Sequence, residues 1–561
     1  MRFSPRFLVL LPVAGAILLV GLNRPPSSNA QTAVPAPDPL GRLPLPPTQN
    51  GGTLGGPLHD LPVQPPTAGP TAVPQAPAKV APTSPPLAPP TPKNAIRVGL
   101  STKGGSLQLW LPGGATLRDV EQSGRVQSVA AGTTLVFGEG PVKTQKVGAA
   151  TFRGPLTVKV GQTTSVGWEH IAIQPLGAVP GRATTNGASA RYGRPYRGGF
   201  EVFPQRSMEP NHRKGPLALI NVVGLEDYLK GVVPWEMDPG APMEALKAQA
   251  ICARTKTLDF KTSGRYQPGG FDVCDYDACQ GYPGTENEKP DTSEAVETTK
   301  GLALFYKGRP IDAVYSTNSG GLTATASDVW RGDVPYLQSV RDFPVGSALD
   351  ELLRGPMNEA KWGQFVSQSF PSFARPDGVS RSAYESRKYR WNQFVSAEEA
   401  SRAFVGQGLS RVISIEVEKR GASGRAWRVK VTGVDAARVK AMPTPVPTLA
   451  PALAPLSKEG EGASPAAPLP LKSVVLESDG PIRSMFSKQL GSTTALPSSL
   501  FVVTPETNAQ GLVSGWNFAG AGWGHGVGMC QRGAQNHAKA GWDARRILNW
   551  YYKGVELRAV S

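Results

Sequence analysis

Hydrophobic and polar residues alternate in short segments where the chain first departs from a proline-rich composition. Four such segments have the sequences AIRVGL, SLQLWL, TLVFGE and LTVKVG, and they begin at Ala95, Ser106, Thr134 and Leu156. An alternation with a period of two places every second side chain of a strand on the same face. The Gly-Gly, Pro-Gly and Gly-Glu pairs between the segments are typical of tight turns. Residues 95–220 are therefore predicted to form a strand-rich subdomain of small antiparallel strands.

A helical period appears after this part of the chain. Pro242 suits the first turn of a helix, and the residues that follow repeat at spacings of three and four. One face of this predicted helix carries Met243, Leu246, Ala250, Ala253 and Thr257. Alternation returns in VISIEVEKR and AWRVKVTG, and Asp543 is a suitable N-cap for a last helix. Residues 221–561 are predicted to form a mixed helix–strand body, so the fold class is α+β.

Proline accounts for 55 and glycine for 64 of the 561 residues, and two segments are especially rich in proline. Residues 31–94 consist mainly of Pro, Ala, Thr and Gly, so they bury too little apolar surface to offset the entropy of ordering. They are predicted to form a disordered spacer. Residues 442–470 have a similar composition and are predicted to be a surface insert within the body.

The first 30 residues have the pattern of an export signal. Met1–Phe7 contains two arginines and no acidic residue, and an apolar stretch ends at Leu22. Ser28 and Ala30 form a small-residue cleavage pattern, as in a secretory signal peptide. An uncleaved membrane anchor through residues 7–22 is the alternative. Either interpretation predicts export to the periplasm or cell wall, with the membrane contacted only through this segment.

The formal net charge is +16 and the pI is near 9.7, which indicates affinity for anionic partners. The Lys and Arg residues are scattered singly rather than interleaved with aromatic residues. This distribution favours attraction to an anionic matrix and argues against a nucleic-acid site.

Glu236 is the most notable candidate for chemistry, because it lies within the apolar run VVPWEM. Apolar surroundings raise the pKa of a carboxyl group, whereas the positive end of the predicted following helix lowers it. A group balanced in this way can both give and take a proton near neutral pH. A structural role, with Glu236 capping the following helix, fits the local sequence equally well. Asp238 precedes Pro239 and Gly240 and is predicted to be a turn residue.

Several separated motifs occur in a fixed order around this segment. They are LEDYLKGVVPWEM, ALKAQAICARTKTL, VCDYDACQGY, STNSGGLTATASDVW, PYLQSV and GWGHGVGMCQRGAQNHAKAGW. Together they resemble the stage II sporulation protein D / LytB (SpoIID/LytB, amidase enhancer) family, over most of the chain from about residue 95 onward. The resemblance implies peptidoglycan remodelling, with glycan strands as the partner and the essential Glu of the family at Glu236.

Two functions follow from this resemblance. Sporulation members are lytic transglycosylases of peptide-stripped glycan, in which one Glu protonates the glycosidic oxygen and then deprotonates the 6-hydroxyl of the sugar. That mechanism leaves 1,6-anhydro ends and needs no second carboxylate, unlike ordinary glycoside hydrolysis. The alternative is a non-catalytic wall-binding protein that enhances an N-acetylmuramoyl-L-alanine amidase, which would then be its partner.

The resemblance also suggests residues around the acid. His525 and Gln531 belong to GWGHGVGMCQ, where Gln531 is expected to bind substrate. His525 is the second catalytic candidate, expected to position Glu236 or bind glycan; a packed structural His is the alternative. Substrate binding is further expected from the STNSGG turn and from two residues after the second loop cysteine. These residues are Asn318, Ser319, Gly320, Gly321, Gln280 and Tyr282. A simple turn and a structural Tyr282 remain alternatives.

Cys274 and Cys279 mark a region where the family carries zinc ligands. This sequence has Ala278 where many relatives have His, and two thiols alone make a poor zinc site. A Cys274–Cys279 disulfide is predicted instead, because exported chains are oxidised. No cofactor is expected, and zinc is not favoured. Three alternatives are open for Cys252 and Cys530. They form a disulfide with each other, they complete a zinc site, or they stay buried as small apolar residues.

Overall fold

The computed structural model describes residues 94–560, with short gaps. The gaps are residues 102–106, 123, 140–144, 148–149, 153–155, 161, 177–179, 185–192, 205–216, 331, 377–382, 441–468 and 488–495. The chain divides into two units, residues 1–75 and 76–561, and every described residue belongs to the second. The predicted export signal, the spacer apart from Asn94, and the insert apart from its last two residues lie outside the described residues. Helices and several sheets are mixed along the described chain, which confirms the α+β prediction.

Most strands of residues 95–224 belong to two sheets that share one core, and β15, from further along the chain, is the edge strand of the first sheet. The first sheet has the order β15-β1-β14-β13-β10-β3-β4 and the second has the order β12-β11-β2-β5-β8-β9. Leu109 and Leu135 of the second sheet belong to the same buried cluster as Ile173, Val202 and Leu219 of the first. The strands of the first sheet are β1 (Ala95–Leu100), β3 (Ala115–Asp119), β4 (Val126–Val129), β10 (Ile171–Pro175), β13 (Gly199–Pro204), β14 (Leu217–Gly224) and β15 (Val273–Cys274). Those of the second are β2 (Leu107–Leu111), β5 (Thr133–Glu139), β8 (Leu156–Val160), β9 (Thr163–Trp168), β11 (Gly181–Thr184) and β12 (Arg194–Tyr196), and β6 (Gln145–Val147) pairs with β7 (Ala150–Phe152).

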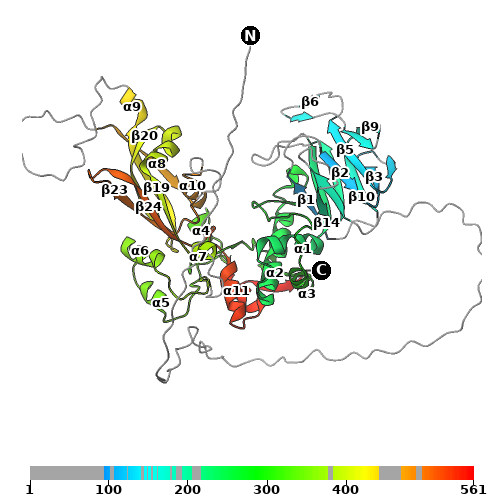
Figure 1. Cartoon of the computed structure of the whole chain (residues 1–561). Helices are drawn as coiled ribbons and strands as arrows, with labels where there is room; N and C mark the ends of the chain where they lie inside the picture. Colours follow the sequence, from blue (N-terminus) through cyan, green and yellow to red (C-terminus); the bar gives the residue numbers. More distant parts are fainter. Residues whose placement is uncertain are drawn as a thin grey trace, which may run out of the picture. The chain divides into compact units, whose positions relative to one another are not determined.

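The helix predicted from Pro242 is α2 (Met243–Ser263), and it lies among other helices (Figure 1). It contacts α1 (Leu225–Glu236), α3 (Pro290–Thr298), α11 (Gln531–Lys539) and α12 (Ala544–Tyr551). Small residues fill much of its surface, so the neighbouring helices approach closely. The buried residues of α2 include Leu246, Ala250, Ala253 and Thr257, as the spacing predicts. Asp543 caps α12 by accepting a hydrogen bond from the backbone N–H of Arg546, which confirms that prediction too.

Two motifs far apart in the sequence meet beside these helices. Strand β18 (Tyr315–Ser316) pairs in parallel with β25 (Met529–Cys530), and Asn318 bridges to Trp523. Gly320 has a φ of 75°, and a Cβ there would lie 2.9 Å from the Cβ of Ala521. Gly320 is thus required by its positive φ and by close packing against the start of the GWGHG segment. A nearby sheet consists of β16 (Leu302–Tyr306), β17 (Arg309–Pro310) and β26 (Glu556–Ala559).

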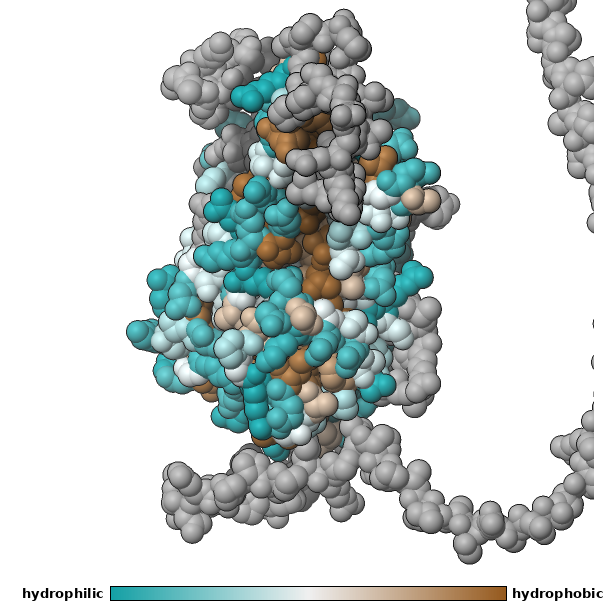
Figure 2. Space-filling model, turned by 90° about the vertical axis from the view of Figure 1, so that its left-hand side faces the viewer, coloured by the Kyte–Doolittle hydropathy of each residue, from teal (hydrophilic) through white to brown (hydrophobic). Residues whose placement is uncertain are grey.

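The rest of the described chain adds two three-stranded sheets and several short helices. The predicted pair VISIEVEKR and AWRVKVTG is confirmed as β20 (Leu409–Arg420) and β21 (Ala426–Asp435), which pair antiparallel. The other strands are β22 (Leu471–Glu477), β19 (Arg390–Ser396), β23 (Phe501–Thr507) and β24 (Val513–Ala521). The helices are α4 (Ala326–Val329), α5 (Ala348–Leu352), α6 (Glu359–Ser367), α7 (Ala383–Tyr389), α8 (Ala397–Phe404), α9 (Ala436–Lys440) and α10 (Asp479–Arg483), and the 3₁₀ turns are Gln267–Gly269 and Val405–Gln407. The face drawn in Figure 2 is mostly hydrophilic, with hydrophobic residues gathered in a narrow interrupted stripe.

Candidate active site

Glu236 is the last residue of α1, at the carboxyl end of that helix. It therefore belongs to a helix of its own, which the sequence did not show ahead of α2. The N-cap of α2 is Pro242, which makes no side-chain cap hydrogen bond, so Glu236 does not cap α2. The sequence obscured α1 because Pro234 lies inside it, where proline usually disfavours a helix.

The carboxyl group of Glu236 is held from several directions. The backbone N–H of Gly281 donates to its Oε1 at 2.8 Å, and the neighbouring Tyr315 hydroxyl likewise favours the ionised carboxylate and lowers its pKa. Gln531 Nε2 donates to the backbone carbonyl of Glu236 at 2.7 Å. Burial raises the pKa of Glu236 to about 7, although the Gly281 N–H opposes this effect; the charge of Asp277 adds to it. Glu236 consequently exchanges a proton near neutral pH.

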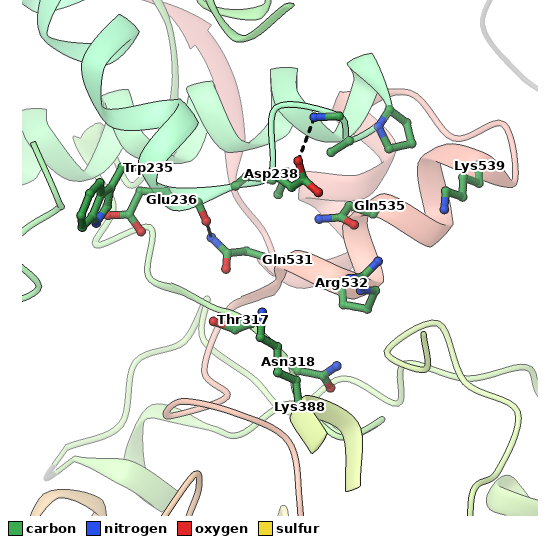
Figure 3. A pocket seen from close by; sticks show the side chains of 14 residues that line it. Trp235, Glu236, Asp238, Thr317, Asn318, Lys388, Gln531, Arg532, Gln535 and Lys539 are labelled. Atoms are coloured by element: carbon green, nitrogen blue, oxygen red, sulfur yellow. Dashed lines mark hydrogen bonds between the residues drawn. The ribbon is translucent and has the colours of Figure 1, made fainter. Parts of the chain in front are cut away.

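A cavity of about 480 Å³ opens beside Glu236. Figure 3 shows that its lining comes from the end of α1, the α1–α2 turn, the STNSGG turn, α7 and α11. The lining residues are Trp235, Glu236, Met237, Asp238, Gly240, Ala241, Pro242, Thr317, Asn318, Lys388, Gln531, Arg532, Gln535 and Lys539. Amides, a hydroxyl and charged groups dominate, which is the chemistry of a site for a polar, hydroxyl-rich ligand.

Two of the predicted substrate-binding residues, Asn318 and Gln531, line this cavity, but their polar groups have internal partners. The Asn318 side chain donates to the carbonyl of Ala374 at 2.8 Å and accepts from the N–H of Gly320. Gln531 holds the main chain of Glu236 and also donates to Gln249 Oε1 at 3.2 Å. Both residues shape the cavity by fixing its walls.

Ser319, Gly320 and Gly321 do not line the cavity, contrary to the prediction that they bind substrate. All three are buried, and the Ser319 N–H donates to Cys530 Sγ at 3.2 Å. The Gly321 N–H donates to Ser319 Oγ at 3.2 Å. The turn joins two segments of backbone and exposes only its first residues to the cavity.

Gln280 is 1% exposed, so the structure places it behind Glu236 rather than against substrate. Its Nε2 donates to the Tyr315 hydroxyl at 3.2 Å. Its Oε1 accepts from Thr257 Oγ1 at 2.9 Å and from the Tyr228 hydroxyl at 3.3 Å. Because the amide nitrogen donates to the Tyr315 oxygen, the hydrogen of that hydroxyl is left to point at Glu236. Gln280 is thus a positioning residue.

Tyr282 is also buried, with 2% of its surface exposed, which does not fit the predicted stacking on a sugar. Its hydroxyl donates to Asn221 Oδ1 at 2.9 Å, and its ring packs against Tyr196 and Tyr228. The alternative, a structural Tyr282, agrees with these contacts.

His525 does not line the cavity and makes two main-chain contacts. Its Nδ1 accepts a hydrogen bond from the N–H of Val527 at 3.0 Å, and the ring also hydrogen-bonds the backbone of Tyr315. Burial lowers the pKa of His525 to about 3, so the ring stays neutral at physiological pH. His525 is therefore not placed to bind glycan in the cavity, which was one of its two expected roles. Any positioning of Glu236 by His525, the other expected role, is indirect and passes through Tyr315.

Cys274 and Cys279 are free thiols in the structure, so the predicted disulfide is not formed there. They remain close, because the Cys274 N–H donates to Cys279 Sγ at 3.0 Å. Cys252 and Cys530 are likewise free and buried, as one of the three alternatives predicts. Within the described part of the chain, no group of three or more His, Cys, Asp or Glu residues is arranged to hold a metal ion. Also within that part, no helix is long and apolar enough to cross a membrane.

The raised pKa of Glu236 predicts a pH-dependent difference in stability between the wild type and Glu236→Gln. Burial favours the protonated carboxyl, so the associated stability is present below about pH 4.5 and is lost as the pH rises through about 7. The amide variant cannot ionise. We expect it to be more stable than the wild type by about 2–3 kcal/mol at about pH 8, with this advantage absent at about pH 4. Urea unfolding at both pH values measures the free energy of unfolding of the two proteins. The same difference between them at about pH 4 and about pH 8 would contradict a buried carboxyl that titrates near pH 7.

Three residues around Glu236 were not singled out from the sequence as ligand-contacting or positioning groups. Tyr315 lies in a short strand without a recognisable motif, and Gly281 resembles any loop glycine. Trp235 appeared only as an apolar neighbour of Glu236, yet its side chain is 52% exposed. That exposure could not be deduced, because it depends on which face of the α1 terminus meets the cavity.

Part of this site lies in a segment that is similar to a known protein family. Residues 213–306 match the family model for stage II sporulation protein. This range contains α1, α2, Glu236 and Gly281. Residues 470–528 match the model of a domain of unknown function.

Individual relatives match over different lengths. An uncharacterized protein of Brachyspira hyodysenteriae is 27% identical over 343 residues, covering 61% of this chain and 68% of that protein. The amidase enhancer of Bacillus subtilis is 29% identical over 333 residues, covering 59% of this chain and 40% of the relative. Stage II sporulation protein D of Bacillus subtilis is 36% identical over 132 residues, covering 21% and 38%. The chain therefore spans less than half the length of both named Bacillus relatives.

Proposed function

We propose that the chain is a member of the SpoIID/LytB family, to whose model and named relatives it is similar, and that it is a lytic transglycosylase that cleaves peptidoglycan glycan strands. The family supports a cell-wall-related role. The finer assignment depends chiefly on one observation, a carboxyl group of pKa about 7 on a polar cavity. We further propose that residues 1–30 direct export, so that the protein reaches the wall.

In this proposal the protonated Glu236 first donates its proton to the glycosidic oxygen. The resulting carboxylate then removes the proton from the 6-hydroxyl of the same sugar, whose oxygen attacks the anomeric carbon. The glycosidic bond breaks, a 1,6-anhydro ring forms and Glu236 is protonated again, so the acid is regenerated. A pKa near the working pH serves both transfers. The Gly281 N–H and Tyr315 hydroxyl stabilise the transient carboxylate.

Asp238 is the other carboxylate on the cavity, and a pair of carboxylates is what a hydrolase uses. Its Oδ1, however, accepts the N–H of Gly240 at 3.0 Å, which closes the turn predicted from Pro239 and Gly240. Figure 3 shows this contact pointing Asp238 toward its own turn. We therefore assign Asp238 a structural role and leave both proton transfers to Glu236.

A second candidate function is a wall-binding protein without catalytic activity, with a wall amidase as its partner. It is favoured by the name of the amidase enhancer, which aligns with 59% of this chain. A pure binding surface has little use for a buried carboxyl that titrates near neutral pH, which is why the enzyme is preferred.

Purified protein incubated with peptide-free glycan strands tests these two functions. The lytic transglycosylase is expected to release soluble fragments with anhydro ends when no amidase is present. The binding protein would co-sediment with glycan but release nothing unless an amidase is added, and that outcome would overturn the proposal.

A further inference from the structure

Trp235 is an exposed aromatic residue at the edge of the cavity. Its side chain is 52% exposed, compared with 47% for Phe394 and 40% for Trp330. It precedes Glu236 directly in α1 and is the one aromatic residue among those lining the cavity. Figure 3 shows its indole beside the Glu236 side chain. Single exposed apolar residues are common on protein surfaces, but this ring lies on the wall of a cavity beside the acid, where a bound ligand can cover it.

The indole of Trp235 is held in place by Gly281. A Cβ added to Gly281 would lie 2.0 Å from both Cδ1 and Nε1 of the indole, so the ring packs directly on the glycine backbone. The same Gly281 donates its N–H to Glu236 Oε1. Gly281 therefore holds both the Trp235 indole and the Glu236 carboxyl group, so the distance between the ring and the acid is fixed.

The charge of the cavity limits what can lie on this ring. Aromatic faces attract ammonium groups, but Lys388, Arg532 and Lys539 also line the cavity and would repel a cationic ligand. The other lining groups include Thr317 and Gln535, which suit hydroxyl and amide partners. A pyranose ring combines an apolar C–H face with polar groups at its rim, so it fits both the indole and the remaining lining.

We propose that Trp235 forms a sugar-binding subsite, in which the apolar face of an N-acetylated pyranose stacks on the indole beside Glu236. This inference rests on the proposed function and adds a residue that sets how the glycan lies relative to the acid. Stacking of this kind contributes more affinity than the burial of apolar surface alone would give.

Binding of an N-acetylglucosamine tetramer, measured by calorimetry, tests the subsite without turnover. The protein is used with Glu236→Gln, so that no cleavage occurs. Adding Trp235→Ala is expected to weaken binding about 5–10-fold, and adding Trp235→Phe, which keeps a ring, only about 2–3-fold. Phe394→Ala removes a comparably exposed ring that does not line the cavity, and it should leave the affinity unchanged. Circular dichroism verifies that each variant is folded.

The outcomes separate the subsite from the proposed activity. Equal affinity with and without the Trp235 ring would overturn the subsite, even if the wild type cleaves glycan. If binding depends on Trp235 but the wild-type protein does not cleave glycan, the subsite is supported and the proposed lytic function is wrong. A uridine oligonucleotide is the comparison ligand; if it, and not the sugar, loses affinity with Trp235→Ala, the ring serves nucleobases and the sugar proposal is wrong.

Discussion

Glu236→Gln is expected to lower the rate of glycan cleavage by roughly 10³-fold or more, because one group performs both proton transfers. The amide keeps the size of the side chain and its Oε1 still accepts the Gly281 N–H, so the surrounding contacts survive. It cannot donate an acidic proton to the leaving oxygen or take one from the 6-hydroxyl. Release of soluble fragments per unit time measures the effect.

The same variant must remain folded and bind glycan like the wild type for this result to be informative. Asp238→Asn is the matched control, since it neutralises the other carboxylate on the cavity, whose Oδ1 is already engaged by Gly240. We expect that control to retain most of its activity. If Asp238→Asn were as damaging as Glu236→Gln, a two-carboxylate hydrolase would be the better account.

Gly281→Ala is expected to lower the cleavage rate about 100-fold, although the change adds a single methyl group. The new Cβ would lie 2.0 Å from the indole of Trp235, so either the indole or the loop must move. Movement of the loop takes the Gly281 N–H away from Glu236 Oε1, and the loss of that donor raises the pKa of the carboxyl further. The alkaline limb of the pH–rate profile should consequently shift to higher pH.

Gly240→Ala provides the control for this prediction. Gly240 also lines the cavity, but a Cβ there would meet only Asp238 Oδ1, at 3.5 Å, which is ordinary contact. Near-normal activity is expected. The double variant Trp235→Ala/Gly281→Ala removes the clash. Adding Gly281→Ala to Trp235→Ala should therefore lower the cleavage rate much less than adding it to the wild type. Equal losses in both backgrounds would show that the indole is not the cause.

The sequence predicted several elements with a strong period and singled out Glu236, which lines the cavity. The existence of α2 and of the pair β20–β21 follows from their spacing, but the burial of α2 on several sides does not, because it depends on the helices and strands that pack around it. Helix α1 was hidden by Pro234, which tertiary packing tolerates near the end of the helix. The electrostatic account of Glu236 was correspondingly incomplete, since burial is the largest cause of its raised pKa and the sequence did not show the hydrogen bond from the Gly281 N–H.

Residues around Glu236 were harder to assign because their roles depend on burial. Gln280 and Tyr282 follow Glu236 by over forty residues, and nothing local indicates that both face the core. His525 stays a candidate positioning residue only, because its ring contacts main-chain groups and does not line the cavity. Tyr315 was missed because its importance comes from the parallel pairing of β18 with β25, which joins segments about two hundred residues apart.

The most direct test of the central claim is to run the cleavage in ¹⁸O-labelled water and to weigh the products by mass spectrometry. If Glu236 alone drives attack by the 6-hydroxyl, each new end is a 1,6-anhydro sugar, lighter than a hydrolysed end by one water molecule, and carries no label. New ends that retain the mass of water and contain ¹⁸O would show that water is the nucleophile, and the single-carboxylate mechanism at Glu236 would be wrong.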